Sequence, residues 1–155
     1  MDEKLLSVSI ITVSWNSAAH IARQVESTQK AAQHISIEQF VIDNGSTDET
    51  ANIVRKQFPS VRFIQNKENR GFGAANQQGV ELSKGKYLLF LNPDMQLSLG
   101  SLDTFVEWMD KHADVAIASP LLLNEQGEVN REATPRRFPK LWEQIALILK
   151  IPHAF

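Results

Sequence analysis

The chain has 155 residues, no cysteine, and 16 Lys plus Arg against 18 Asp plus Glu, so its formal net charge is −2. The length suits one compact domain, and 43% hydrophobic with 22% charged residues is typical of a globular protein. The absence of cysteine excludes disulfides, thiolate metal sites and thiol catalysis. The near-neutral charge argues against nucleic acid as a partner, because such binding usually needs a broad basic face.

The sequence shows neither a secretory signal at its N-terminus nor a membrane-spanning run. Met1, Asp2, Glu3 and Lys4 lack the net positive charge of a secretory signal. No apolar run reaches the roughly 18 residues needed to span a bilayer. We therefore expect a soluble chain, and the lack of cysteine fits a reducing compartment such as the cytoplasm.

Five short apolar runs predict strands, at residues 8–13, 40–42, 61–64, 87–91 and 115–119. Helical spacing of apolar residues or capping signals predict helices between them, beginning near residues 18, 46, 73 and 102.

Three details of these elements follow from local chemistry. Ser46 with Glu49 matches a capping box, so a helix is expected to start there. Gly85 stands where a helix C-terminal cap is expected. The run 87–91 is apolar without alternation, which predicts a strand buried on both faces.

The order βαβαβαβαβ predicts the α/β class: a Rossmann-like, mostly parallel sheet with helices on both faces. In such sheets, ligands bind outside the carboxyl ends of the strands, near the point where the strand order reverses.

Polar residues follow three of the predicted strands and are expected to share one edge of the sheet. They are Ser14 to Asn16, Asp43 to Asp48, and Asn92 to Asp94. Each group alone can be explained as a helix cap or a turn. Two carboxylates, Asp43 and Asp94, at the ends of buried strands are costly unless something binds there.

Two other α/β functions fit poorly. A dinucleotide-binding fingerprint on Gly71 and Gly73 would need a third glycine at Asn76 and would follow the first strand rather than the third. A signalling receiver domain needs acidic residues after the first strand, where Ser14-Trp15-Asn16 stand.

Four motifs in order resemble the nucleotide-sugar half of inverting glycosyltransferases of family 2, of the bacterial rhamnosyltransferase-like kind. They are Val13-Ser14-Trp15-Asn16, Asp43-Asn44-Gly45-Ser46-Thr47-Asp48, Asn69 to Asn76, and Leu91-Asn92-Pro93-Asp94. The resemblance covers about residues 7 to 139 and implies the GT-A fold, which agrees with the periodicity.

The resemblance also implies roles for particular residues. Asp43 would accept the imino N–H of uracil or thymine, so the donor would be a UDP- or dTDP-linked sugar. Asp94 would hold Mg²⁺ or Mn²⁺ against the diphosphate, although Asn92 stands where many relatives have a further Asp. Arg70 could reach a phosphate or be a solvated loop arginine. The donor-binding residues are expected to be Ser14, Trp15, Asn16, Asp43, Asn44, Ser46, Arg70, Gly71, Asn76 and Asn92.

The reaction implied is sugar transfer with inversion to a glycan or lipid-linked acceptor, as in polysaccharide biosynthesis. It needs a general base, which is expected beyond Phe155. The late acids Glu125, Glu128, Glu132 and Glu143 fit turn or surface positions better. We therefore expect a truncated enzyme, with a donor domain at 1–139 and a segment at 140–155 leading to an absent acceptor half. The alternative is a non-catalytic module that binds nucleotide sugars.

The last residues contain two further features. Arg136 and Arg137 could meet donor phosphates or anionic headgroups, or form a solvated basic loop. Leu141 to Ile151 is apolar nearly all round. It could pack on another domain, lie at the inner face of a membrane, or pair with a second copy of the chain.

Overall fold

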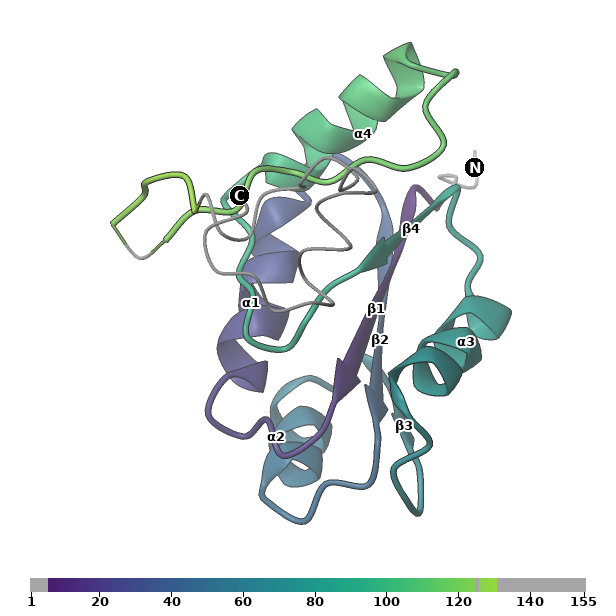
Figure 1. The fold of residues 1–155 in the computed structure, drawn as a ribbon, viewed down its shortest axis with the longest axis vertical. Coiled ribbons are helices and arrows are strands. Elements are labelled where there is room, and N and C mark those ends of the chain that lie inside the picture. The colour runs from purple at the N-terminus through teal and green to yellow at the C-terminus, as the bar shows by residue number, and fades with distance from the viewer. Residues whose placement is uncertain (1–5, 125, 131–155) are drawn as a thin grey trace, which may run out of the picture. The chain divides into compact units, whose positions relative to one another are not determined.

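A computed structural model describes residues 6–124 and 126–130 of the chain. The chain divides into two units, Met1–Val115 and Ala116–Phe155, and each is described by itself. In the first unit, strands and helices alternate strictly (Figure 1). They are β1 (Val8–Ser14), α1 (Ile21–Ala31), β2 (Ile37–Asp43), α2 (Thr50–Gln57), β3 (Arg62–Gln65), α3 (Phe72–Leu82), β4 (Tyr87–Phe90) and α4 (Ser101–Lys111).

The four strands form one parallel sheet in the order β3-β2-β1-β4. Ser14 at the end of β1 is in register with Asp43 at the end of β2, and Ile11 of β1 is in register with Phe90 of β4. From β1 the chain adds β2 and then β3 on one side, and it returns to add β4 on the other side of β1. The point where the strand order reverses therefore lies between β1 and β4.

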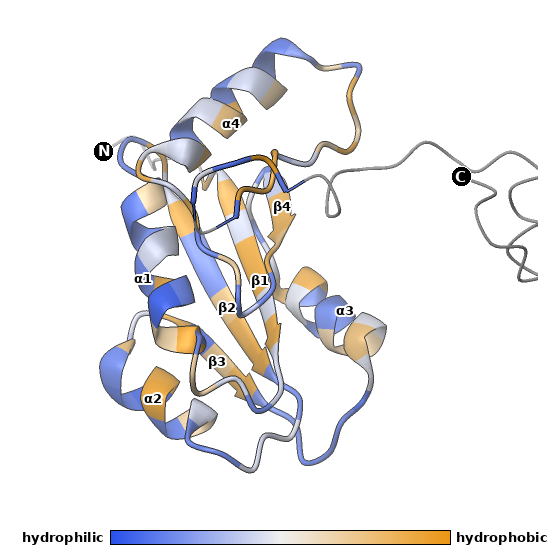
Figure 2. Ribbon diagram, turned by 60° about the vertical axis from the view of Figure 1, so that its left-hand side comes forward, coloured by the Kyte–Doolittle hydropathy of each residue, from blue (hydrophilic) through white to orange (hydrophobic). Residues whose placement is uncertain are grey.

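Helices cover both faces of the sheet, as the alternating pattern predicts. On one face, Ile21 and Val25 of α1 pack with Val41 of β2 and Val54 of α2. On the other face, Ala75 of α3 packs against Ile11, Phe40 and Ile42. Figure 1 shows α1 and α2 on one side of the sheet and α3 on the other. Figure 2 shows that the strands between them are largely hydrophobic. This confirms the predicted fold class.

The strand predicted at residues 115–119 is wrong. These residues have no strand geometry, and Ile117 is 90% exposed. An apolar, β-branched run becomes a strand only where a neighbouring strand supplies hydrogen-bond partners. No segment among residues 6–124 and 126–130 pairs with it.

The expected burial of both faces of β4 is also wrong. Leu88 is 43% exposed and Phe90 is 52% exposed, whereas Tyr87 and Leu89 are partly buried. These two side chains are exposed because β4 lies at the edge of the described sheet, where α3 packs mainly on β1 and β2.

Both predicted caps are corrected by the structure. The second helix begins at Thr50, not at Ser46, and the side chain of Glu49 makes no capping hydrogen bond. Ser46 bonds Asp43 instead, as described below. After α3, the helix ends with Ser83 in an extended conformation, and Gly85 lies in close contact with β1. A Cβ at Gly85 would stand 2.5 Å from the Ser9 nitrogen, so this glycine is needed for close approach of two backbones rather than as a cap.

In the second unit, the described residues form a small antiparallel turn. Leu123 and Val129 form an isolated bridge, and Asn124 accepts hydrogen bonds from the main chain of Gln126 and Glu128. The sequence Asn124 to Glu128, with Gly127 at a φ of 79°, is typical of a turn. Three features predicted from the sequence lie outside the described residues: the boundary between residues 139 and 140, Arg136 with Arg137, and the segment 141–151. The division into a donor domain and a C-terminal segment therefore stays a prediction. None of the helices in the described part is long and apolar enough to cross a membrane.

Candidate functional site at the carboxyl ends of the strands

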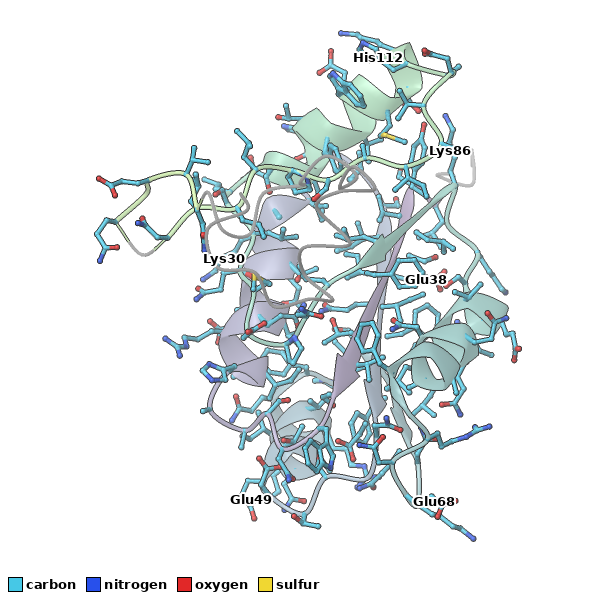
Figure 3. The ribbon with its side chains drawn as sticks, viewed as in Figure 1. Lys30, Glu38, Glu49, Glu68, Lys86 and His112 are labelled. Carbon is cyan, nitrogen blue, oxygen red and sulfur yellow. The ribbon has the colours of Figure 1, made fainter. Side chains whose placement is uncertain are left out.

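The loops that follow the four parallel strands leave the sheet at the same end. The arrows of β1, β2 and β3 point toward this end in Figure 1. In Figure 3, Glu49 and Glu68 mark it, because they lie in the loops after β2 and β3 respectively. The polar residues singled out in the sequence therefore share one edge, as expected for a parallel sheet.

Asp43 is the most buried charged residue of this edge. Its side chain is fully buried at the end of β2. Its Oδ1 accepts hydrogen bonds from the hydroxyls of Ser14, at 3.3 Å, and Ser46, while its Oδ2 accepts one from the Ser46 main-chain N–H at 3.1 Å. Because each carboxylate oxygen has about two acceptor sites, Oδ2 keeps the capacity to accept one further hydrogen bond.

Asn16 connects the loop after β1 to the loop after β2. Its main-chain N–H donates to the Ser46 hydroxyl at 2.9 Å, and its Oδ1 accepts from the Thr47 N–H at 2.9 Å. Asn16 has a φ of 49°, a left-handed conformation that asparagine tolerates better than most residues. The Oδ1 of Asn16 is thus used inside the protein, and its Nδ2 has no partner in the part of the chain that the structure describes.

Asp48 provides the cap that the sequence assigned to Ser46. Its Oδ1 accepts from the N–H of Thr50 at 3.0 Å and from the Thr50 hydroxyl at 2.5 Å, and its Oδ2 accepts from the Ala18 N–H at 3.0 Å. Burial disfavours the charged carboxylate, but these hydrogen bonds outweigh it and lower the pKa of Asp48 below its ordinary value. A charged Asp48 therefore joins the start of α2 to the chain leading into α1.

Asn44 fastens the loop after β3 to the end of β2. Its side chain, 2% exposed, donates from Nδ2 to the Asn69 Oδ1 at 2.8 Å and accepts at Oδ1 from the Arg70 N–H at 3.0 Å. Asn69 Oδ1 also accepts from the Gly71 N–H at 2.9 Å. Asn44 and Gly71, both expected to bind the donor, thus use these polar groups in hydrogen bonds within the protein: Asn44 to the loop after β3, and Gly71 to Asn69 of its own loop.

The other expected donor residues divide into exposed and internally bonded ones. Trp15 is 58% exposed, and Arg70 and Asn92 are also exposed. The Asn76 side chain donates to the Phe72 carbonyl one turn earlier in α3, at 3.0 Å, so its amide is engaged within the helix. Within the described part of the chain, the Arg70 guanidinium has no hydrogen bond or ion pair.

Asp94, the expected metal ligand, follows β4 and is exposed. Its carboxylate makes no hydrogen bond or ion pair with the described residues. No group of three or more His, Cys, Asp or Glu side chains suited to a metal occurs among residues 6–124 and 126–130. A single carboxylate nevertheless fits Mg²⁺, which commonly binds one or two carboxylates together with substrate phosphates and water.

Sequence reasoning missed a group of amides that shapes this edge. Asn66 Nδ2 donates to Gln78 Oε1 at 2.8 Å, and Gln78 Nε2 donates to Asn66 Oδ1 at 3.0 Å. Asn66 Nδ2 also lies 3.3 Å from Asn44 Oδ1. Four amide side chains take part, and they lie up to 34 residues apart in the sequence, so no local periodicity reveals them: Asn44, Asn66, Asn69 and Gln78. The only local signal is the repetition of asparagine in the run 66–69.

Comparison with known families gives one match over nearly the whole chain. The model described as "Glycosyl transferase family 2" matches residues 9–153, which include every strand-end residue described above.

Individual relatives agree with this match. An N-acetylglucosaminyl-diphospho-decaprenol L-rhamnosyltransferase from Mycobacterium tuberculosis is 25% identical over 85% of this chain and 46% of its own length. The succinoglycan biosynthesis protein ExoO of Rhizobium meliloti is 29% identical over 90% of this chain and 41% of its own length. The chain thus spans less than half of these curated relatives.

Among solved structures, the crystal structure of S. aureus TarS 1–349 in complex with UDP-GlcNAc is similar in fold. It superimposes with a TM-score of 0.65 and 26% identity over 84% of this chain and 37% of the TarS chain.

Proposed function

This chain belongs to glycosyl transferase family 2, and on that premise we propose that it forms the nucleotide-sugar-binding part of a glycosyltransferase. The observation that carries the proposal is that the buried Asp43, the exposed Arg70 and the exposed Asp94 each follow the carboxyl end of a strand of the same parallel sheet. In support, TarS 1–349 was crystallised with UDP-GlcNAc and shares this fold.

Asp43 is proposed to read the base. A uracil or thymine ring offers an imino N–H, and Asp43 Oδ2 has one acceptor position left after its bond to Ser46. The carboxylate is already oriented by Ser14 and Ser46. Because Asp43 is fully buried, the residues that cover it would have to move aside for the base. The exposed indole of Trp15 and the free Nδ2 of Asn16 lie in the adjoining loop and complete the surroundings of base and ribose.

The diphosphate is proposed to lie between the loops after β3 and β4. The Arg70 guanidinium can donate two parallel hydrogen bonds to phosphate oxygens. Asp94, with Asn92 beside it in the same turn, would hold a divalent cation together with the phosphates. When bound, such a cation stabilises the negative charge of the departing nucleoside diphosphate as a Lewis acid.

The acceptor and the general base are proposed to come from elsewhere. We propose a glycan or lipid-linked acceptor, in keeping with the names of the relatives from M. tuberculosis and R. meliloti. The base is proposed to lie beyond Phe155, since the late acids of the sequence fit turn or surface positions better; the Glu128 carboxylate, for example, accepts a hydrogen bond from the Asn124 side chain within its own turn. A cytoplasmic position, at the inner face of a membrane, belongs to the same proposal.

Ligand binding by the chain tests this function. We expect UDP or dTDP with Mn²⁺ to raise the melting temperature, because a ligand that binds only the folded state stabilises it by mass action. Asp94→Ala should abolish the difference between measurements with and without Mn²⁺. Asp114→Ala is the matched control, because Asp114 is an exposed aspartate outside the site.

Isothermal titration gives the corresponding affinities. The proposal is contradicted if neither nucleoside diphosphate binds at millimolar concentration, with or without Mn²⁺. It is also contradicted if Asp114→Ala changes the metal dependence as much as Asp94→Ala does.

A further inference from the structure

Asn44 stands at the centre of the hydrogen bonds that hold the loop between β3 and α3. Both ends of its amide are used: Nδ2 bonds Asn69, and Oδ1 accepts from the main chain of Arg70 and from Asn66. The side chain is 2% exposed, so solvent does not compete for these bonds. It immediately follows Asp43, the fully buried carboxylate of the site.

Two further contacts fix the same loop from either side. The paired amides of Asn66 and Gln78 fasten its first residue to α3. Gly45, next to Asn44, packs against the middle of this loop. A Cβ at Gly45 would stand 3.1 Å from the Cα and carbonyl carbon of Glu68. The main chain of this polar loop is therefore ordered by contacts with the end of β2 and with α3.

The Arg70 side chain is exposed at the end of this loop, as are Lys67, Glu68 and Asn69 before it. Its main-chain N–H is bound by Asn44 at 3.0 Å, and the next residue, Gly71, is bound through Asn69 at 2.9 Å. Its guanidinium has no partner among the described residues. We propose that Asn44 is a positioning residue, rather than a donor contact, which holds Arg70 so that its guanidinium meets the diphosphate of the donor.

This inference rests on the proposed function and makes it more specific. A loop arginine without such support would have to lose conformational freedom each time a diphosphate binds, and that loss would weaken binding. With Asn44 in place, the main chain at residues 69–71 is already fixed in the free protein. The benefit falls on the diphosphate alone, because Asn44 bonds the loop that carries Arg70, whereas Asp43, the proposed reader of the base, is held by Ser14 and Ser46.

The test compares a nucleoside with its diphosphate. Dissociation constants for uridine and UDP, and for thymidine and dTDP, are measured with Mn²⁺ on the wild-type chain and on Asn44→Ala. We expect Asn44→Ala to weaken diphosphate binding about tenfold while nucleoside binding changes less than about twofold. Asn52→Ala removes an exposed amide from α2 as a matched control and should change neither.

A double-mutant cycle separates positioning from general stability. If Asn44 acts through Arg70, then Asn44→Ala should have almost no further effect on UDP binding once Arg70→Ala is present. Additive losses, equal losses for uridine and UDP, or no loss at all would overturn the inference. If Asn44→Ala does not fold, Asn69→Ala, which removes the exposed partner in the loop, is expected to show the same selective loss, and its absence overturns the inference.

The outcomes also separate this inference from the proposed function. A wild-type chain that binds no nucleoside diphosphate contradicts the proposed function itself. A wild-type chain that binds UDP normally, together with an Asn44→Ala chain of equal affinity, contradicts only the role of Asn44.

Discussion

The main-chain N–H of Asn16 donates a hydrogen bond to the hydroxyl of Ser46 at 2.9 Å, although 30 residues separate them in the sequence. The same hydroxyl donates to the carboxylate of Asp43. Ser46 therefore joins the loop after β1 to the buried acid at the end of β2. Two neighbouring strand ends are coupled through a single side-chain oxygen.

Replacing this oxygen should affect both stability and ligand binding. We expect Ser46→Ala to lower the free energy of unfolding by about 1–2 kcal/mol, because the buried Oδ1 of Asp43 loses a donor. UDP binding should weaken as well, since the carboxylate is less firmly oriented. Urea unfolding and isothermal titration measure the two effects. Ser60→Ala, in an exposed turn, is the control, and a comparable loss there would contradict the explanation.

Close packing of α3 on the sheet depends on Gly79. A Cβ at this position would lie 2.6 Å from Cγ2 of Ile11, a fully buried side chain of the central strand β1. We expect Gly79→Ala to lower the free energy of unfolding by about 1–3 kcal/mol, because Ile11 or the helix must shift.

Gly73 is the matched control in the same helix. A Cβ there meets no atom within 4 Å, so Gly73→Ala should leave stability unchanged or raise it by up to about 1 kcal/mol. Thermal and urea unfolding of both variants test the contrast. Equal effects at the two positions would show that helix propensity, rather than the contact with Ile11, determines the result.

The fold was predictable because it depends on patterns within short segments. The apolar β-branched run in β1 and the i, i+3, i+4, i+7 spacing of Ala18, Ile21, Ala22 and Val25 leading into α1 specify element type locally. The order of such elements then specifies a parallel sheet and places Asp43 and Asp94 at one edge.

The errors concern features decided by distant residues. Gly85 lies against Ser9, 76 residues earlier, and nothing in its neighbourhood signals that contact. Ser46 fits a capping box, but the nearby Asp43 carboxylate binds it instead and Asp48 takes the capping role. The amide of Asn44 looks like a ligand contact in sequence, and only the fold shows that it binds Asn69 and Arg70.

Two buried glutamines should respond oppositely to the same substitution. Gln39 in β2 is 6% exposed, and neither Nε2 nor Oε1 has a partner in the described part of the chain. Gln24 in α1 is fully buried and its Oε1 also has no partner in the described part of the chain, but its Nε2 donates to the hydroxyls of Thr12 and Thr28 at 3.1 and 3.3 Å. A buried amide without hydrogen-bond partners lowers the stability of the folded state, whereas a hydrogen-bonded one raises it.

We therefore expect Gln39→Met to raise the free energy of unfolding by about 1 kcal/mol and Gln24→Met to lower it by about 1–2 kcal/mol. Methionine is close in volume to glutamine, so packing changes little. Urea unfolding measures both. A loss of stability in Gln39→Met would mean that ordered water satisfies this amide in solution.

Asp103 joins the first turn of α4 to the connection between α1 and β2. Its carboxylate accepts three main-chain hydrogen bonds, from Gln33 at 2.8 Å, His34 at 2.9 Å and Ile35 at 3.1 Å. Burial disfavours the charged form, but these three bonds outweigh it, so the pKa of Asp103 lies below its ordinary value. The charged carboxylate therefore stabilises the folded chain.

The sign of the pH dependence follows from this lowered pKa. The stabilisation is complete above the ordinary aspartate pKa of about 4 and is lost as the pH falls through the lower pKa of the folded state. We expect Asp103→Asn to lower the free energy of unfolding by about 1–2 kcal/mol at pH 7, and the difference from wild type to shrink below about pH 4. Urea unfolding between pH 7 and pH 2.5 measures this difference. Asp114→Asn, at an exposed position, is the control. If the difference in unfolding free energy between Asp103→Asn and wild type stays constant down to pH 2.5, the three hydrogen bonds do not depend on the charge of Asp103.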